Sequence, residues 1–339
     1  MVIIMIKFTE LKNNKRNDLK SVIPLKKPYT LLIEPSSLCN FSCKMCFQSA
    51  HKQGEFKNKK SLMDIDCFNK IIEQVKTWEG PKIKVLKLSL YGEPLLNKHF
   101  SEMLSIAKSA DIAERIETTT NASLIDEIVA KSLIDNEIDY IRVSIYSVNQ
   151  EKHKEITKND ISIEKIFSNL KRLQELKKKY NKIKPFIAVK MLDTFSEENE
   201  IFIDKYKDIA DEIYIDQPHN WVQPEDETFI DKLYGEKPDI KKIKKSACPM
   251  PFTTLAIRSN GEVAPCCIDW YGGTNLGNIY DEKLQEIWEG KSLYYFQVMQ
   301  LESRNYENVS CRNCEFYLNP YYCLDDIDGL SIEKLNKPI

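Results

Sequence analysis

Ten cysteines in a chain of 339 residues constrain this sequence more than any other feature, because nine of them fall into two groups. Cys39, Cys43 and Cys46 form one tight run, and six more lie between residues 248 and 323. The first residues form only a short apolar run without a basic leader, which predicts a cytoplasmic protein with no signal peptide and no membrane span. Cytosolic thiols stay reduced, so clustered cysteines indicate metal sites rather than disulfides.

Charge and length set two further bounds. The 49 basic and 51 acidic residues give a formal net charge of −2, which argues against a nucleic-acid partner because such a partner selects for a basic surface. At about 100–200 residues per domain, the length predicts two domains, or one large domain with an appendage.

Six short apolar runs alternate with amphipathic helical segments in the first two thirds of the chain. Such alternation predicts an α/β fold with a parallel sheet and right-handed crossovers. Periodicity alone does not choose between a barrel and an open doubly wound sheet. The expected strands are 30–34, 85–91, 115–120, 140–146, 185–192 and 212–216.

The character of the sequence changes after residue 216, where a polar stretch with several prolines precedes the second cysteine group. Polar, proline-bearing stretches between periodic segments are typical of linkers. The resulting division is an N-terminal extension 1–28, a strand–helix domain 29–217, a linker 218–245, a cysteine-bearing domain 246–325 and a tail 326–339.

The first cysteine run has the spacing C-x₃-C-x₂-C and follows the first expected strand. Three thiolates this close can hold a [4Fe–4S] cluster, which normally takes four cysteines, and so leave one iron open for a ligand. A zinc site is the alternative, with His51 as a candidate fourth ligand.

This run resembles the signature of the radical S-adenosylmethionine (SAM) enzymes, and Cys39, Cys43 and Cys46 match its three cluster ligands. The resemblance implies a partial (β/α)₆ TIM-like barrel. It also implies that the open iron chelates the amino and carboxylate groups of SAM. One electron from the cluster then cleaves SAM to methionine and a 5′-deoxyadenosyl radical, which abstracts a substrate hydrogen.

The resemblance extends to the ends of four further strands, where parallel barrels place their sites. Tyr91-Gly92-Glu93-Pro94 resembles the family's Gly-Gly-Glu-Pro motif, with Tyr91 in place of the first glycine. In that motif the glutamate accepts a hydrogen bond from the SAM ammonium. By the same resemblance, SAM-binding roles are implied for Phe47, Gly92, Glu93, Thr120, Asn121, Ser144 and Lys190.

The second cysteine group combines an expected hairpin between residues 258 and 263, turned by Asn260-Gly261, with a C-x₂-C pair. By spacing alone, such a four-thiolate set is also typical of a zinc ribbon. The wider sequence resembles the SPASM extension of radical SAM enzymes, in its shortened Twitch form. The resemblance implies one auxiliary [4Fe–4S] cluster, with Cys267 a small buried side chain and Cys323 a spare or rival to the ligands Cys248, Cys266, Cys311 and Cys314.

A cluster with four cysteine ligands has no open iron, so it most naturally moves electrons. The resemblance therefore implies a dehydrogenase that oxidises an alcohol of a sugar, an aminocyclitol or a similar small molecule. The second electron passes to the auxiliary cluster, and flavodoxin or ferredoxin serves as electron donor. The candidate catalytic residues, at or after the strand ends, are Tyr146, Asp216 and His219.

Two other functions remain open at this point. The first is radical SAM modification of a peptide, by thioether formation, carbon–carbon crosslinking or epimerisation. About 28 residues precede the first expected strand, too few for a peptide-recognition domain, which favours a small molecule. The second is a non-catalytic zinc-binding module, which would hold zinc and leave SAM intact.

Overall fold

The computed structural model describes residues 18–50, 60–216, 243–270, 272–312, 314–319 and 323–336. Within these residues, one nine-stranded sheet has the order β6-β5-β4-β3-β2-β1-β7-β8-β9, and the strands from β6 through β1 to β7 run parallel. The parallel strands are β1 (Thr30–Ile33), β2 (Ile83–Leu88), β3 (Ala113–Thr120), β4 (Tyr140–Ile145), β5 (Phe186–Leu192), β6 (Glu212–Asp216) and β7 (Thr254–Ile257).

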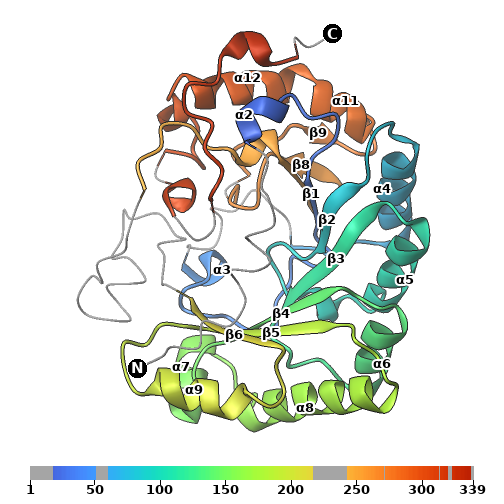
Figure 1. Cartoon of the computed structure of the whole chain (residues 1–339), viewed down its shortest axis with the longest axis vertical. Helices are drawn as coiled ribbons and strands as arrows, with labels where there is room; N and C mark the ends of the chain where they lie inside the picture. The colour runs from blue at the N-terminus through green and yellow to red at the C-terminus, as the bar shows by residue number, and fades with distance from the viewer. Residues whose placement is uncertain are drawn as a thin grey trace.

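Helices follow most strands and cover one side of the sheet. Figure 1 shows the sheet curving, with α4, α5, α6 and α8 on its outer side and α3 on its inner side. This arrangement confirms the expected α/β fold and its partial barrel. The helices are α2 (Leu19–Val22), α3 (Phe47–Ala50), α4 (Ile65–Thr77), α5 (Phe100–Ala110), α6 (Glu127–Asp135), α7 (Gln150–Thr157), α8 (Ile163–Lys179), α9 (Glu198–Tyr206), α11 (Leu284–Glu289) and α12 (Lys291–Leu301).

The two faces of the sheet differ in chemistry, because successive side chains of a strand point to opposite faces. Leu86 and Leu88 of β2, like Ile141 and Val143 of β4, join the hydrophobic core formed with the helices. The residues between them, Lys87 and Arg142, face the inner side, and both are charged. The helices therefore pack on the apolar outer face of the sheet. The inner face, which is concave, carries the charged and polar side chains.

The C-terminal hairpin extends this sheet rather than forming a separate one. β7 pairs in parallel with β1, and β8 (Glu262–Ala264) and β9 (Gly277–Asn278) follow in antiparallel pairing. The expected turn is present, with Gly261 at φ +83°, a conformation that glycine adopts without strain. The predicted cysteine-bearing domain thus builds on the edge strand of the predicted barrel.

The end of β2 and the search for a membrane-spanning helix bear on two other expectations. β2 ends at Leu88, three residues before the expected end at 91, because the chain turns there against the loop after β1. No helix among the described residues is long and apolar enough to cross a membrane.

Candidate functional site

The first cysteine run lies on the loop after β1, and contacts with α7 hold the course of this loop. The Ser42 N–H donates to the Thr157 carbonyl at the end of α7, at 2.9 Å. Within the loop, the Phe41 N–H donates to Cys39 Sγ at 3.4 Å. Backbone contacts therefore fix the loop before any ligand arrives.

The three thiols of this loop are close enough to disturb one another electrostatically. Desolvation of the thiol raises the pKa of Cys46 to about 11 and that of Cys39, an exposed residue, to about 11 as well, and the neighbouring charges of Glu93 and Cys46 add to the shift at Cys39. The pKa of Cys43 rises further, through burial and then through Cys46 and Cys39. Thiolates are the metal-binding form, so three of them coexist here only with cations that replace their protons.

The assignment of these thiols to a cluster, rather than to a single zinc ion, stays a prediction from their spacing in the sequence. Among the described residues, no three His, Cys, Asp or Glu side chains converge on one point where a metal ion would sit. In a cubane cluster each thiolate binds a different iron, so its ligands stand further apart than those of one zinc ion. His51, the candidate fourth zinc ligand, lies outside the described residues.

Glu93 follows β2 and lies at the centre of a buried hydrogen-bond network. Its carboxylate accepts from the Asn121 N–H at 2.8 Å, the Thr120 hydroxyl at 2.7 Å and the Leu95 N–H at 3.2 Å. Burial nevertheless raises the pKa of Glu93 to about 7. The structure thus brings Glu93, Thr120 and Asn121 together. A cationic ligand group beside the buried carboxylate would stabilise its charged form.

Gly92 has a steric reason to be glycine. A Cβ atom there would lie 2.3 Å from the Leu38 carbonyl oxygen and 2.4 Å from that of Ser36. The next residue continues the contact, since the Glu93 N–H donates to the Leu38 carbonyl at 2.8 Å. The motif after β2 therefore packs directly on the loop that leads to Cys39.

Ser144, Lys190 and Asp216 also meet, on adjacent strands. Ser144 of β4 pairs in register with Lys190 of β5, whose ammonium forms an ion pair with Asp216 at 2.7 Å. Asp216 is only 6 % exposed. The ion pair places a fixed carboxylate at the carboxyl end of β6, while His219, the other acid–base candidate, lies outside the described residues.

Two aromatic residues of the predicted site, Phe47 and Tyr146, lie close to the first cysteine run. Phe47, just after Cys46, stacks on Trp270 with ring centres 4.7 Å apart and meets Tyr91 edge-on at 5.2 Å. The phenol of Tyr146 forms a hydrogen bond with the Cys43 thiol. Phe47 therefore connects the first cysteine loop to the C-terminal region, and Tyr146 lies beside the first cysteine group.

The second cysteine group surrounds a cavity in the C-terminal region. All four expected ligands, and neither Cys267 nor Cys323, line this cavity. Apolar side chains such as Phe296 form much of the remaining wall. Burial raises the pKa of all four thiols, to about 12 for Cys311 and Cys314 and well above the ordinary value for Cys248 and Cys266.

The two remaining cysteines of this group differ. Cys267 is half-buried and packs beside Leu32, Ala256 and Ala264 on the inner side of the sheet. Cys323 is 3 % exposed and close enough to Cys248 to raise its pKa, so it stays a rival ligand.

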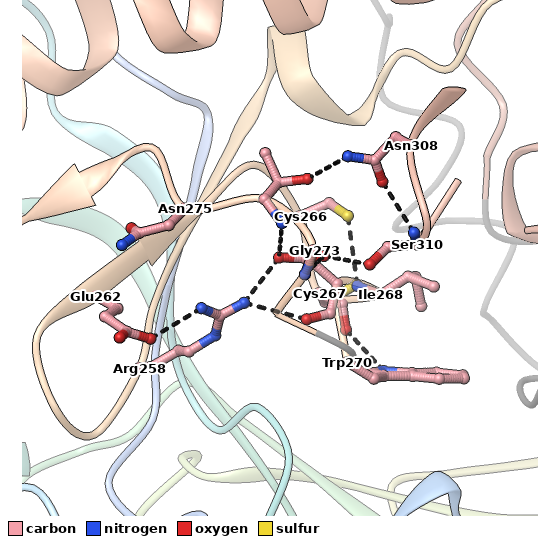
Figure 2. Close-up of polar contacts among 12 residues, drawn as sticks. Arg258, Glu262, Cys266, Cys267, Ile268, Trp270, Gly273, Asn275, Asn308 and Ser310 are labelled. Carbon is pink, nitrogen blue, oxygen red and sulfur yellow. Dashed lines mark hydrogen bonds and ion pairs between the residues drawn. The ribbon is translucent and has the colours of Figure 1, made fainter. Parts of the chain in front are cut away.

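Sequence reasoning missed the residue that organises this cavity, Asp269. Its buried carboxylate pairs with Arg258 Nη2 at 2.7 Å and accepts hydrogen bonds from the Ser310 hydroxyl and from the Gly273 N–H, the latter at 3.1 Å. The Arg258 guanidinium bridges from this carboxylate to Glu262, and Figure 2 shows its contact with Glu262. One side chain thus joins the hairpin to the loops that carry Cys266 and Cys311.

Asn308 completes the network beside Cys311. Its side chain donates to the Thr274 hydroxyl at 2.7 Å and accepts from the N–H groups of Ser310 and Cys311 at 2.9 and 3.2 Å. The backbone of Cys311 is therefore held in place relative to the loop after Cys266. The only sequence signal for this role is the position of polar residues next to cysteines.

Comparisons with known proteins agree with this geometry. The model of the radical SAM superfamily matches residues 33–189, and that of the SPASM iron–sulfur cluster-binding domain matches residues 248–315. Among curated proteins, the tungsten-containing aldehyde ferredoxin oxidoreductase cofactor-modifying protein of Pyrococcus furiosus is 24 % identical over 334 residues, covering 84 % of this chain and 86 % of that protein.

Two solved structures share the fold. BtrN in complex with AdoMet and 2-DOIA superposes with a TM-score of 0.55 at 16 % identity, covering 92 % of this chain and 99 % of that chain. SuiB of Streptococcus suis bound to its precursor peptide SuiA superposes with a TM-score of 0.61 at 16 % identity, covering 90 % and 76 % respectively.

Proposed function

We propose, from the premise that this chain belongs to the radical SAM superfamily and carries a C-terminal SPASM iron–sulfur domain, that it oxidises an alcohol of a small molecule such as a sugar or an aminocyclitol. SAM and iron–sulfur clusters are its cofactors. When bound, they supply a 5′-deoxyadenosyl radical that takes a hydrogen atom from the carbinol carbon, and an acceptor for the second electron.

The four-thiol cavity carries the oxidative part of this proposal. Cys248, Cys266, Cys311 and Cys314 line one cavity, so an auxiliary [4Fe–4S] cluster there has a full set of thiolate ligands. No position is left for a substrate to bind to iron. Such a site favours electron transfer over substrate binding, and an electron acceptor makes the reaction oxidative.

The residues of the chain supply binding and proton transfer. Cys39, Cys43 and Cys46 hold the SAM-binding cluster. Glu93 accepts a hydrogen bond from the SAM ammonium, in a network that already aligns its carboxylate. The remaining cofactor contacts that we propose are Phe47, Gly92, Thr120, Asn121, Ser144 and Lys190.

The reaction balances with one base. The alcohol loses a hydrogen atom, an electron and its hydroxyl proton, and a ketone remains. Asp216, fixed by Lys190, and Tyr146 are the described candidates for contact with this proton, and His219 remains a third. We propose that reduced flavodoxin or ferredoxin supplies electrons in the cytoplasm, with no nucleic-acid or membrane partner.

Peptide modification is the competing outcome. SuiB, which shares the fold, was solved with a precursor peptide, whereas BtrN was solved with 2-DOIA. Both structures share the fold with this chain at 16 % identity, so the proposal of a small-molecule alcohol rests on the four-thiol cavity and is decided by the substrate test.

The test begins with anaerobic reconstitution of the full chain with iron and sulfide. We expect about eight iron atoms per chain, from two four-iron clusters, and 5′-deoxyadenosine on addition of SAM and reductant. The triple variant C39A/C43A/C46A should lose half of the iron and all SAM cleavage. C248A/C311A should also lose half of the iron but keep SAM cleavage without product oxidation.

The matched control is C67A, which removes a buried cysteine outside both groups and should keep the full iron content. Wild-type protein that fails to cleave SAM contradicts the catalytic assignment. A redox-neutral product, or turnover of peptides only, contradicts the dehydrogenase proposal while leaving SAM cleavage intact.

A further inference from the structure

We infer that the concave face of the sheet binds an acidic group of the substrate, a carboxylate or a phosphate, through Lys87 of β2 and Arg142 of β4. This inference rests on the proposed function, because it takes the concave face as the place where the substrate lies. It adds the charge of the substrate, which the cysteine sites do not reveal.

The placement follows from strand alternation. Lys87 lies between Leu86 and Leu88, and both of these leucines belong to the core against the helices. Arg142 likewise lies between two core residues of β4. Lys87 pairs in register with Glu117 of β3, so Lys87, Glu117 and Arg142 stand on neighbouring strands and on the face away from the helices.

One cation on this face, the ammonium of Lys87, has no ion pair among the described residues. The guanidinium of Arg115 contacts Glu117 at 2.5 Å, and the ammonium of Lys190 contacts Asp216 at 2.7 Å. Lys87 is half-buried, and no described carboxylate lies within ion-pair distance of its ammonium. An ammonium drawn away from water without a partner is costly, and a bound anion would offset that cost.

Two pKa shifts report the same positive field. Burial, together with Arg142 and Lys190, lowers the pKa of Lys87 to about 8 even though Glu117 acts in the opposite direction. Burial alone would raise the pKa of Glu117, yet Lys87, Arg115 and Arg142 hold it below its ordinary value. Positive neighbours lower the pKa of both the Lys87 ammonium and the Glu117 carboxyl group. The single negative charge of Glu117 therefore does not neutralise this face.

Two hydroxyl groups point to a ligand at the same place. Ser89 directly follows β2 and is 4 % exposed, and its hydroxyl has no hydrogen-bond partner among the described residues. The hydroxyl of Thr119, two residues beyond Glu117 on β3, is buried and likewise unpartnered. Buried polar groups normally have a hydrogen-bond partner, so a polar ligand between the cations and the strand ends would supply the partner that these two hydroxyls lack.

The chemistry of the two cations fits an oxyanion. Lysine supplies a compact point charge and arginine a planar fork that matches carboxylate and phosphate oxygens. Both residues lie below the carboxyl ends of their strands, where Glu93 and Thr120 mark the proposed SAM site. An acidic group held there would leave the rest of the substrate directed towards SAM.

The test measures binding to the reconstituted, SAM-loaded protein by isothermal titration calorimetry. The probes are inorganic phosphate, glucose 6-phosphate and glucuronate, with glucose as the neutral counterpart. We expect at least one acidic sugar to bind tenfold or more tightly than glucose. The phosphate and carboxylate arms show which oxyanion the site prefers.

Variants locate the effect. K87M and K87Q should remove the preference for the acidic sugar, and K87R should keep it. K84Q is the matched control, because Lys84 lies on the same strand but is exposed, with its ammonium 3.9 Å from the centre of the Tyr29 ring. R142M should weaken the same probe as K87M.

Equal binding of acidic and neutral probes, or no binding of any acidic probe, overturns the inference. So does an equal loss in K84Q and K87M. SAM cleavage by the wild type and by K84Q is followed in parallel, as the check that the reconstituted protein is active. An intact anion preference without alcohol oxidation would sink the proposed function alone, and oxidation of neutral substrates only would sink the anion site alone.

Discussion

The two cysteine groups reach similar chemistry by different structural routes. The first places three thiols on one short loop, whose course is set by the strand before it and by α7. The second gathers thiols from segments 248, 266 and 311–314 around one cavity. A local site tolerates changes far away in the sequence, whereas the gathered site depends on the contacts that hold its segments together.

The largest expected effect comes from D269N, which should break the gathered site only. Removing the carboxylate charge leaves the buried Arg258 guanidinium with Glu262 as its remaining carboxylate partner, and breaking a buried charge pair of this kind costs about 3 kcal/mol. We expect iron content to fall by half while SAM cleavage persists. Iron analysis and 5′-deoxyadenosine release measure the two sites separately.

D281N is the control for this change, because Asp281 is exposed in the same region. It should leave both the iron content and the thermal midpoint as in wild type. If D269N kept all of its iron, the network in Figure 2 would have no role in holding the cavity together.

G92A should do the reverse and disturb the local site. The added Cβ meets the carbonyl oxygens of Leu38 and Ser36 well inside van der Waals distance, so the loop before Cys39 must shift. Overpacking of this kind costs about 1–3 kcal/mol. We expect a large loss of SAM cleavage with the auxiliary iron retained, measured on the same sample. Loss of both halves of the iron would show that the two sites are not independent.

The contrast also explains what sequence could predict. The strands and the first site depend on local patterns, so alternation located β1 to β6, and spacing predicts a single site at Cys39, Cys43 and Cys46. Asp269 and Arg258 acquire their role only when the hairpin folds back, and no spacing encodes that. The parallel pairing of β7 with β1 joins segments more than 200 residues apart, which periodicity does not reveal.

The charged concave face was missed for a related reason. Lys87 and Arg142 interrupt apolar strands, and in a single sequence such residues read as ordinary surface charges. The meaning of Lys87 depends on which of its neighbours are already paired, namely Arg115 with Glu117 and Lys190 with Asp216. That pairing is visible only in three dimensions.

E93Q probes the ligand contact of the local site with a smaller effect. The glutamine keeps the shape but loses the charge-assisted hydrogen bond to the SAM ammonium, so we expect SAM affinity to fall about tenfold, or about 1.4 kcal/mol. Because the pKa of Glu93 is raised to about 7, the carboxylate becomes neutral as the pH falls through 7. Wild-type SAM affinity should therefore weaken between pH 8 and pH 6, and E93Q should remove that dependence. Calorimetric titration with SAM at both pH values measures it.

The smallest effect should come from the contact between the two sites, where Phe47 of the first loop stacks on Trp270 of the second region. W270F keeps an aromatic ring for this stack but loses the hydrogen bond from the indole N–H to the Cys267 carbonyl, 3.1 Å long. We expect a loss of about 1 kcal/mol in the free energy of unfolding, with the iron of both sites retained.

W288F is its matched control, because Trp288 donates a 2.8 Å hydrogen bond to the Leu25 carbonyl. Both variants should lose similar stability in thermal or denaturant unfolding, since each loses one indole hydrogen bond. Only W270F has a route to the cysteine sites. A fall in SAM cleavage or in iron content in W270F but not in W288F would mean that the stack transmits structure from one site to the other. The local site would then depend on the gathered one, which the loop's own backbone contacts argue against.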